Sequence, residues 1–108
     1  MTVNKHKLLI VDDEISNLQK LRRTFFGDFQ IFEALNGSEA IQLLRKRPVD
    51  IIITDQRMPE TTGVDVLRES LILAPEAIRI ILTGYTEIDY LMDAINEGQV
   101  HRYITKPW

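Results

Sequence analysis

The sequence contains no cysteine. Disulfide bridges, thiol nucleophiles and thiolate metal sites are therefore excluded. No uninterrupted apolar run approaches the roughly 20 residues that a membrane span needs. The N-terminal stretch, Met1 to Lys7, also lacks the apolar segment of a signal peptide. We therefore expect a cytoplasmic protein that does not engage a membrane.

The sequence also has no excess of basic over acidic residues. The chain has 13 Lys and Arg against 16 Asp and Glu, which gives a formal net charge of -3. Without a basic footprint, we expect no direct nucleic-acid binding by this domain. No glycine-rich loop follows the first apolar run, which excludes the common nucleotide-binding motifs. What is present is ordinary for a globular protein, with 44% hydrophobic residues, and 108 residues fit one domain, 1–108.

Short apolar runs predict the strands. They span residues 8–11, 29–34, 51–55, 78–83 and 100–105. Such runs, rich in β-branched residues, are typical of buried strands. The second run is less apolar and predicts an edge strand. Because helical patterns separate the runs, we expect an α/β fold of parallel β-α-β units with right-handed crossovers.

Apolar residues at helical spacing predict four helices between these runs. Asn36 resembles an N-cap of the second helix, with Glu39 placed to reach back to it, and Thr62 can cap the third. The apolar positions, helix by helix, are Ile15, Leu18, Leu21 and Phe25; Ala40, Ile41 and Leu44; Val64, Val66, Leu67, Leu71 and Ile72; and Ile88, Leu91, Met92 and Ile95.

Polar residues of a consistent kind stand at the carboxyl ends of the predicted strands. These are Asp12, Asp13, Asp55, Thr83 and Lys106. Parallel strands bring these ends to one edge of the sheet. Crowded carboxylates repel one another unless a cation neutralises them, and an all-oxygen site suits Mg²⁺. A lysine and a hydroxyl would donate to phosphate oxygens. The pattern predicts phosphoryl transfer, with Asp55 as the nucleophile that becomes an aspartyl-phosphate.

Each of these residues also has an ordinary structural interpretation. Asp12 and Asp13 could form an acidic helix N-terminus, Asp55 could be a turn former, and Lys106 could be a solvated edge-strand residue. Thr83 could simply end a strand. The joint pattern favours a functional site, because all five of these residues follow or end a predicted strand at its carboxyl end.

With these residues assembled, the chain resembles a receiver domain of the bacterial two-component response regulators. Four segments carry the resemblance, from Leu8 to Trp108: Val-Asp-Asp-Glu, Thr-Asp-Gln-Arg-Met-Pro with Gly63, Ile-Leu-Thr-Gly, and Tyr-Ile-Thr-Lys-Pro-Trp. The resemblance implies a flavodoxin-like, doubly wound sheet of five parallel strands in the order 2-1-3-4-5. It also implies a signalling switch rather than a metabolic enzyme, one that catalyses only its own phosphorylation and dephosphorylation.

The resemblance further implies how the acids divide the work. Asp55 would accept a phosphoryl group from a sensor histidine kinase. Asp13 and Asp55 would bind Mg²⁺ directly, with the backbone carbonyl of Arg57 as a third ligand, and Asp12 would act mainly through a bound water.

The remaining roles implied by the family concern the phosphoryl group and its readout. Lys106 would pair with that group, and Thr83 would donate its hydroxyl to it. Thr83 and Tyr103 would move together as the switch. Arg57 and Tyr85 flank the site and would tune the lifetime of the phosphate by obstructing the attacking water.

The family fold has a further helix after the fifth strand, whereas this sequence ends at Trp108. We therefore expect the chain to be truncated before that helix, with uncovered apolar area that favours a homodimer or other self-association. An output domain outside this chain would carry the response. The segments Thr-Asp-Gln-Arg-Met-Pro and Leu-Thr-Gly-Tyr resemble those of receivers that precede transcriptional output domains of nitrogen- or hydrogenase-type regulators, and of receivers that precede cyclic-dinucleotide enzymes. Of these, we expect a transcriptional output.

Two other functions compete with this interpretation. A magnesium-dependent phosphohydrolase of the haloacid dehalogenase kind typically needs an acid two residues after its nucleophile, and Arg57 occupies that position. An interaction module that has lost phosphorylation would lack an acid or the lysine, and neither the acids nor Lys106 is missing.

Overall fold

The computed structural model describes residues 5–83 and 102–105. Its strands are β1 (His6–Val11), β2 (Phe29–Ala34), β3 (Ile51–Asp55), β4 (Ile78–Thr83) and β5 (Arg102–Thr105), and its helices are α1 (Ile15–Phe25), α2 (Gly37–Lys46) and α3 (Gly63–Leu73). All strand pairs are parallel, and the sheet runs β2-β1-β3-β4-β5. The predicted helix that includes Ile88 and Ile95 lies outside the described residues. The flavodoxin-like α/β class is confirmed.

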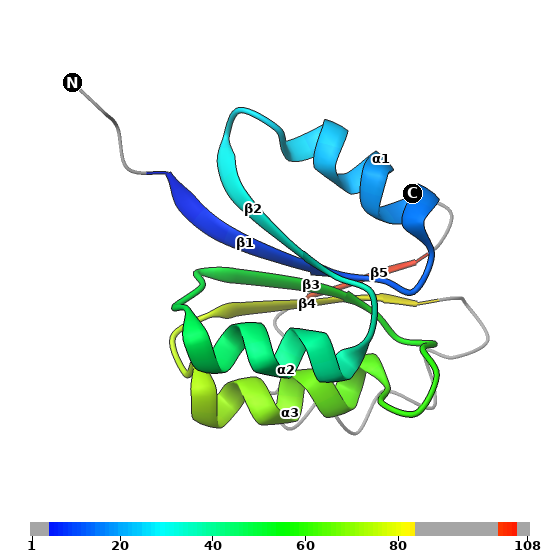
Figure 1. Cartoon of the computed structure of the whole chain (residues 1–108), viewed down its shortest axis with the longest axis vertical. Coiled ribbons are helices and arrows are strands. Elements are labelled where there is room, and N and C mark those ends of the chain that lie inside the picture. The colour runs from blue at the N-terminus through cyan, green and yellow to red at the C-terminus, as the bar shows by residue number, and fades with distance from the viewer. Residues whose placement is uncertain (1–4, 84–101, 106–108) are drawn as a thin grey trace.

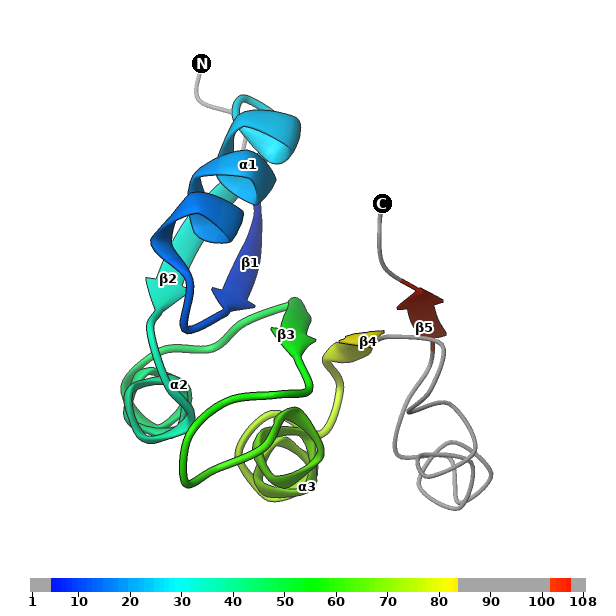
Figure 2. The same cartoon turned by 90° about the vertical axis from the view of Figure 1, so that its right-hand side faces the viewer.

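The sheet separates two helical layers. Helix α1 covers one face, and α2 and α3 lie side by side on the other (Figures 1 and 2). Because strand side chains alternate between faces, β1 supplies both cores. Leu8 and Ile10 pack in the cluster with α1, whereas Leu9 and Val11 pack in the cluster with α2 and α3. None of the helices within the described residues has the length and apolar content to cross a membrane.

Strand position explains the composition of the apolar runs. Strand β1 lies between β2 and β3 and has a helix on each face, so nearly every residue of Leu8–Val11 is completely buried. Strand β2 is an edge strand, as predicted, and among its six residues only Ala34 is buried. The central strands β1 and β3 therefore form a fixed base for the residues that follow them.

Three apolar residues that were expected on helix faces are exposed instead. Ile15 is 60% exposed, so the face of α1 that reaches the sheet begins at Leu18. In α3, Leu71 is exposed and Ile72 is 78% exposed, while Ser70 is buried. Successive helical residues turn by about 100°, so positions one and two after Ser70 rotate away from the sheet. Apolar character alone did not define the buried face of α3.

The predicted helix starts are confirmed. The Asn36 side chain accepts a hydrogen bond from the Glu39 backbone at 2.8 Å. Glu39 itself accepts from the backbone N–H of Leu35 at 3.4 Å, not from that of Asn36. Thr62 caps α3 within a full capping box that Asp65 completes. The box fixes where α3 begins, next to the acid that ends β3.

Candidate functional site

The carboxyl ends of β1, β3 and β4 bring polar residues to one edge of the sheet. Asp12 directly follows β1, Asp55 is the last residue of β3, and Thr83 is the last residue of β4. Asp55 stands opposite Leu82 in the β3–β4 register, one residue before Thr83. All three polar residues are buried, with Asp12 at 0% and Asp55 at 4% exposure. Strand pairing thus collects residues that are far apart in the sequence.

The acids Asp12, Asp13 and Asp55 form a compact cluster. Each offers one carboxylate oxygen, and these oxygens all lie within 4.8 Å of one another. Asp13 is exposed, which leaves the cluster open to solvent on one side. Three negative charges at this spacing require a counter-charge, and hard oxygen donors select hard cations. The donor set therefore fits Mg²⁺, with Asp12, Asp13 and Asp55 as the residues that could hold it.

The start of α1 orients Asp12. One carboxylate oxygen accepts from the backbone N–H of Glu14 at 2.9 Å, and the other accepts from the side-chain amide of Asn17 at 3.2 Å. Asn17 was not predicted as a site residue. The available signal was an asparagine in the first turns of a helix, where its intrinsic propensity is poor. Both oxygens of Asp12 therefore have an amide donor, which defines the orientation of the carboxylate.

The loop after Asp55 is tied back to the sheet. The Gln56 N–H donates to the Leu82 carbonyl at 3.1 Å, and the Gly63 N–H donates to the Gln56 carbonyl at 3.1 Å. Met58 is buried in the core under α2 and α3. Gly63 lies so close to the Asp55 carbonyl oxygen that a Cβ at this position would overlap it. The loop leaves the sheet at Asp55 and returns to the same point at Gly63.

Within this loop, inward and outward side chains alternate. Gln56 and Met58 are buried, whereas Arg57, two residues after Asp55, is exposed. Glu60 adopts a positive φ of 67°, a conformation that is uncommon for a residue with a side chain. The role of the Arg57 carbonyl as a metal ligand remains a prediction.

Several predicted site residues fall outside the part of the chain that the structure describes. Lys106 and Tyr85 lie in the segments 106–108 and 84–101. Tyr103 lies in β5, where it pairs with Ile81 of β4 through the backbone register. The functions assigned to Lys106, Tyr85 and Tyr103 stay predictions.

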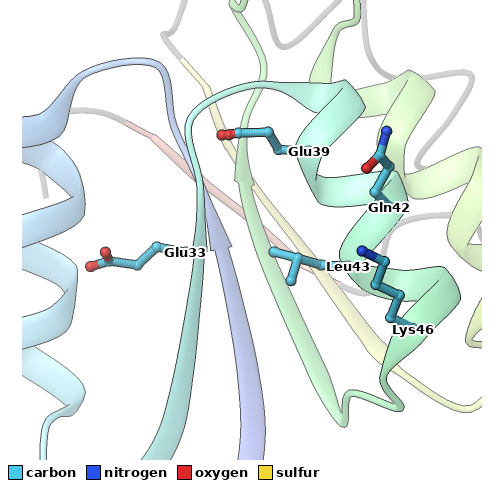
Figure 3. A pocket seen from close by; sticks show the side chains of 5 residues that line it. All are labelled: Glu33, Glu39, Gln42, Leu43 and Lys46. Atoms are coloured by element: carbon cyan, nitrogen blue, oxygen red, sulfur yellow. The ribbon is translucent and has the colours of Figure 1, made fainter.

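A cleft of about 340 Å³ borders the acidic cluster. Its lining includes Asp13 after β1, Asn36 and Ser38 at the start of α2, and Thr61 in the loop after β3. Another cleft, of about 280 Å³, lies between β2 and α2 (Figure 3). There, Gln42 and Lys46 project from α2, and Glu33 points to the opposite side of β2, where it pairs with Arg22. Only the first cleft adjoins the acids.

A doubly wound parallel sheet that collects acids at the carboxyl ends of its strands defines a class of α/β domains with a ligand site at that edge. Within that class, residues 8–108 match the family model of the response regulator receiver domain. The chain belongs to this family, whose members are signalling domains rather than typical enzymes. Receiver domains interact with histidine kinases and bind Mg²⁺ at a cluster of acids.

Individual relatives agree with the family match. The hydrogenase transcriptional regulatory protein HoxA of Cupriavidus necator is 39% identical over 108 residues, which is 100% of this chain and 22% of that protein. The chain thus spans about a fifth of the length of that relative. A solved adenylate cyclase from Rhodopirellula baltica is 35% identical with a TM-score of 0.90, covering 95% of this chain and 77% of that one. The signal receiver domain of an HD domain-containing protein from Pseudomonas fluorescens Pf-5 is 32% identical, with a TM-score of 0.88 over 97% of this chain and 85% of that one.

Proposed function

We propose that residues 1–108 form one receiver domain that acts as a phosphorylation-dependent switch, with Asp55 as the phosphoacceptor. The observation that carries the proposal is the convergence of the Asp12, Asp13 and Asp55 carboxylates within 4.8 Å at the edge of the sheet. A nucleophilic carboxylate must attack phosphorus in line, next to enough positive charge to offset the phosphoryl oxygens.

The reaction uses Asp55 as the attacking group. One carboxylate oxygen forms a bond to the phosphorus of a phosphohistidine on the sensor kinase, the phosphorus–nitrogen bond breaks, and its electron pair leaves on the imidazole. Asp13, Asp55 and the Arg57 carbonyl would hold Mg²⁺, with Asp12 acting mainly through a bound water, and the ion would supply positive charge to offset the phosphoryl oxygens. The buried position of Asp55 next to the fixed Asp12 carboxylate favours one direction of approach, from the side on which Asp13 is exposed.

The product of the reaction is a conformation. In this proposal Lys106 pairs with the phosphoryl group and Thr83 donates its hydroxyl to it, while Tyr103 reports the change on β5. Thr83 is buried at the end of β4, directly after the residue that pairs with Asp55, and this placement supports its role. Bulky Arg57 and Tyr85 would slow hydrolysis by shielding the phosphoryl group from water.

The proposed output is transcriptional and lies outside this chain. The support is the relative from Cupriavidus necator, which is named a transcriptional regulatory protein and of which this chain covers 22%.

Self-association of the chain also remains part of the proposal. Ile104, on the strand at the β5 edge of the described sheet, is 42% exposed and gives apolar area to such a contact. A chain that stays monomeric at all concentrations in sedimentation would contradict that part.

The test of the phosphoacceptor is chemical. The chain is incubated with Mg²⁺ and acetyl phosphate, and intact mass spectrometry measures the addition of one phosphoryl group. We expect a single adduct that is stable in acid and labile in base, and that disappears in Asp55→Asn. An adduct of the same yield in Asp55→Asn, or no adduct in the unaltered chain, would overturn the proposal. Glu69→Gln, which removes an exposed acid on α3, is the control and should leave the yield unchanged.

A further inference from the structure

Gln56 directly follows the proposed phosphoacceptor and is only 6% exposed. Three of its hydrogen-bonding groups connect different parts of the fold. Its N–H donates to Leu82 on β4, and its backbone carbonyl accepts from Gly63. Its side-chain oxygen Oε1 accepts from the backbone N–H of Val64 at 3.0 Å. A single residue therefore links β3, β4 and the first turn of α3.

These bonds close the N-terminus of α3. A helix leaves its first N–H groups without helical partners, and such groups otherwise attract anions or water. Here the N–H groups of Gly63 and Val64 both donate to Gln56, and that of Asp65 donates to the Thr62 hydroxyl. The start of α3 is therefore satisfied within the protein, and Gln56 provides two of the acceptors.

The two hydrogen bonds from the Gly63 and Val64 N–H groups to Gln56, here called the clamp, matter for the acidic cluster because of where they lie. Asp55 and Gln56 share a peptide bond, and the proposed metal-binding carbonyl belongs to the next residue, Arg57. A shift of α3 relative to β3 would leave the buried Val64 N–H without its acceptor, which is unfavourable. The backbone that carries two proposed metal ligands is thus tied to a rigid helix at one buried point.

We infer that Gln56 is a positioning residue of this site: its side-chain carbonyl holds the first turn of α3 against β3 and so fixes Asp55 and the Arg57 carbonyl for metal binding. The consequence for the metal rests on the proposed function. The clamp itself belongs to the metal-free protein and can be tested without phosphorylation.

The first measurement concerns the clamp. Gln56→Met keeps the length of the side chain but removes the strong acceptor, whereas Gln56→Glu keeps an acceptor oxygen whether it is protonated or ionised. In hydrogen exchange of the metal-free chain, we expect the Val64 amide to lose protection in Gln56→Met and to recover it in Gln56→Glu. Unchanged protection of Val64 in Gln56→Met would overturn the inference.

The second measurement concerns metal binding. Calorimetric titration with Mg²⁺ should show a dissociation constant raised roughly three- to tenfold in Gln56→Met, as the loss of one positioning hydrogen bond predicts. Ser70→Ala is the matched control, because it removes a buried hydroxyl that bonds to Leu67 within α3. It should lower stability without changing Mg²⁺ affinity. A Gln56→Met chain that binds Mg²⁺ as the unaltered chain does would reduce Gln56 to a structural role and overturn the inference.

Two further comparisons keep the test decisive. If Gln56→Met does not fold, Gln56→Asn replaces it, since the shorter amide cannot reach Val64 and should show the same losses. The proposed function is tested separately, by whether acetyl phosphate phosphorylates Asp55. If acetyl phosphate leaves the unaltered chain unmodified while Mg²⁺ affinity still depends on Gln56, the phosphoacceptor assignment fails and the positioning role stands.

Discussion

Gly63 lies against the carbonyl oxygen of Asp55, so the start of α3 is in contact with the backbone of the acid that ends β3. A Cβ at residue 63 would overlap that oxygen and would also crowd the Cα of Gln56. The atoms in its way are backbone atoms of Asp55, which ends the central strand β3, and of Gln56, and backbone cannot move aside as a flexible side chain can. The shape of the site therefore depends on the absence of a side chain at position 63.

We predict that Gly63→Ala lowers both stability and site function. Overpacking against backbone typically destabilises a fold by about 1–3 kcal/mol, and here the displacement would include Asp55. Urea unfolding should show the loss, and Mg²⁺ titration should show weaker binding. Gly27→Ala is the control, because Gly27 has a positive φ of 95° but nothing within 4 Å of an added Cβ. It should cost about 1 kcal/mol through backbone strain alone and leave Mg²⁺ binding unchanged.

Removing one acid from the cluster should act in opposite directions with and without metal. In EDTA, Asp13→Asn should raise the free energy of unfolding by about 0.5 kcal/mol, because it relieves repulsion with Asp12 and Asp55. With Mg²⁺ at about ten times its dissociation constant, the unaltered chain should gain about 1.4 kcal/mol. Asp13→Asn should gain less. Thermal unfolding with and without Mg²⁺ measures both effects, and equal stabilisation of the two chains would count against the metal site.

The capping box of α3 gives a prediction for stability. Thr62 accepts from the Asp65 N–H at 3.3 Å, and Asp65 accepts from the Thr62 N–H at 3.1 Å. Thr62→Val keeps the shape of the side chain but removes the oxygen, so it should lower the free energy of unfolding by about 1 kcal/mol. Denaturant titration measures the change. Thr24→Val, in α1, alters a hydroxyl that only bonds back to Lys20 within its own helix, and it should change stability by less.

Variants of Arg79 separate two contributions to stability, the packing of its side chain and its charge. It is buried in β4, and its guanidinium contacts the Ala74 carbonyl at the end of α3 at 3.5 Å. Burial lowers the pKa of Arg79, because the charged form is less well solvated, although the group remains charged at neutral pH. Arg79→Met keeps most of the packing volume, so it should cost less stability than Arg79→Ala. Arg79→Ala should cost about 2–3 kcal/mol, and equal losses in the two variants would show that the charge dominates.

The sequence alone determined which elements form and which residues stand at their ends. Apolar runs with acids at their carboxyl ends predict buried parallel strands, and this local pattern is reliable because both faces of β1 and β3 are covered. The cluster of Asp12, Asp13 and Asp55 follows from that topology. The caps at Asn36 and Thr62 were also predictable, since a cap acts within one helical turn.

Only the tertiary structure decided which neighbours complete the site. The contacts of Asn17 with Asp12 and of Gln56 with Val64 depend on side-chain rotamers and on the exact approach of helix to strand. Neither is encoded in spacing or composition. The exposure of Ile15 and Ile72 has the same origin, because an apolar residue is buried only where another element faces it. The acids of the site could therefore be predicted from the sequence, whereas the residues that orient them could be identified only from the packing of strands and helices.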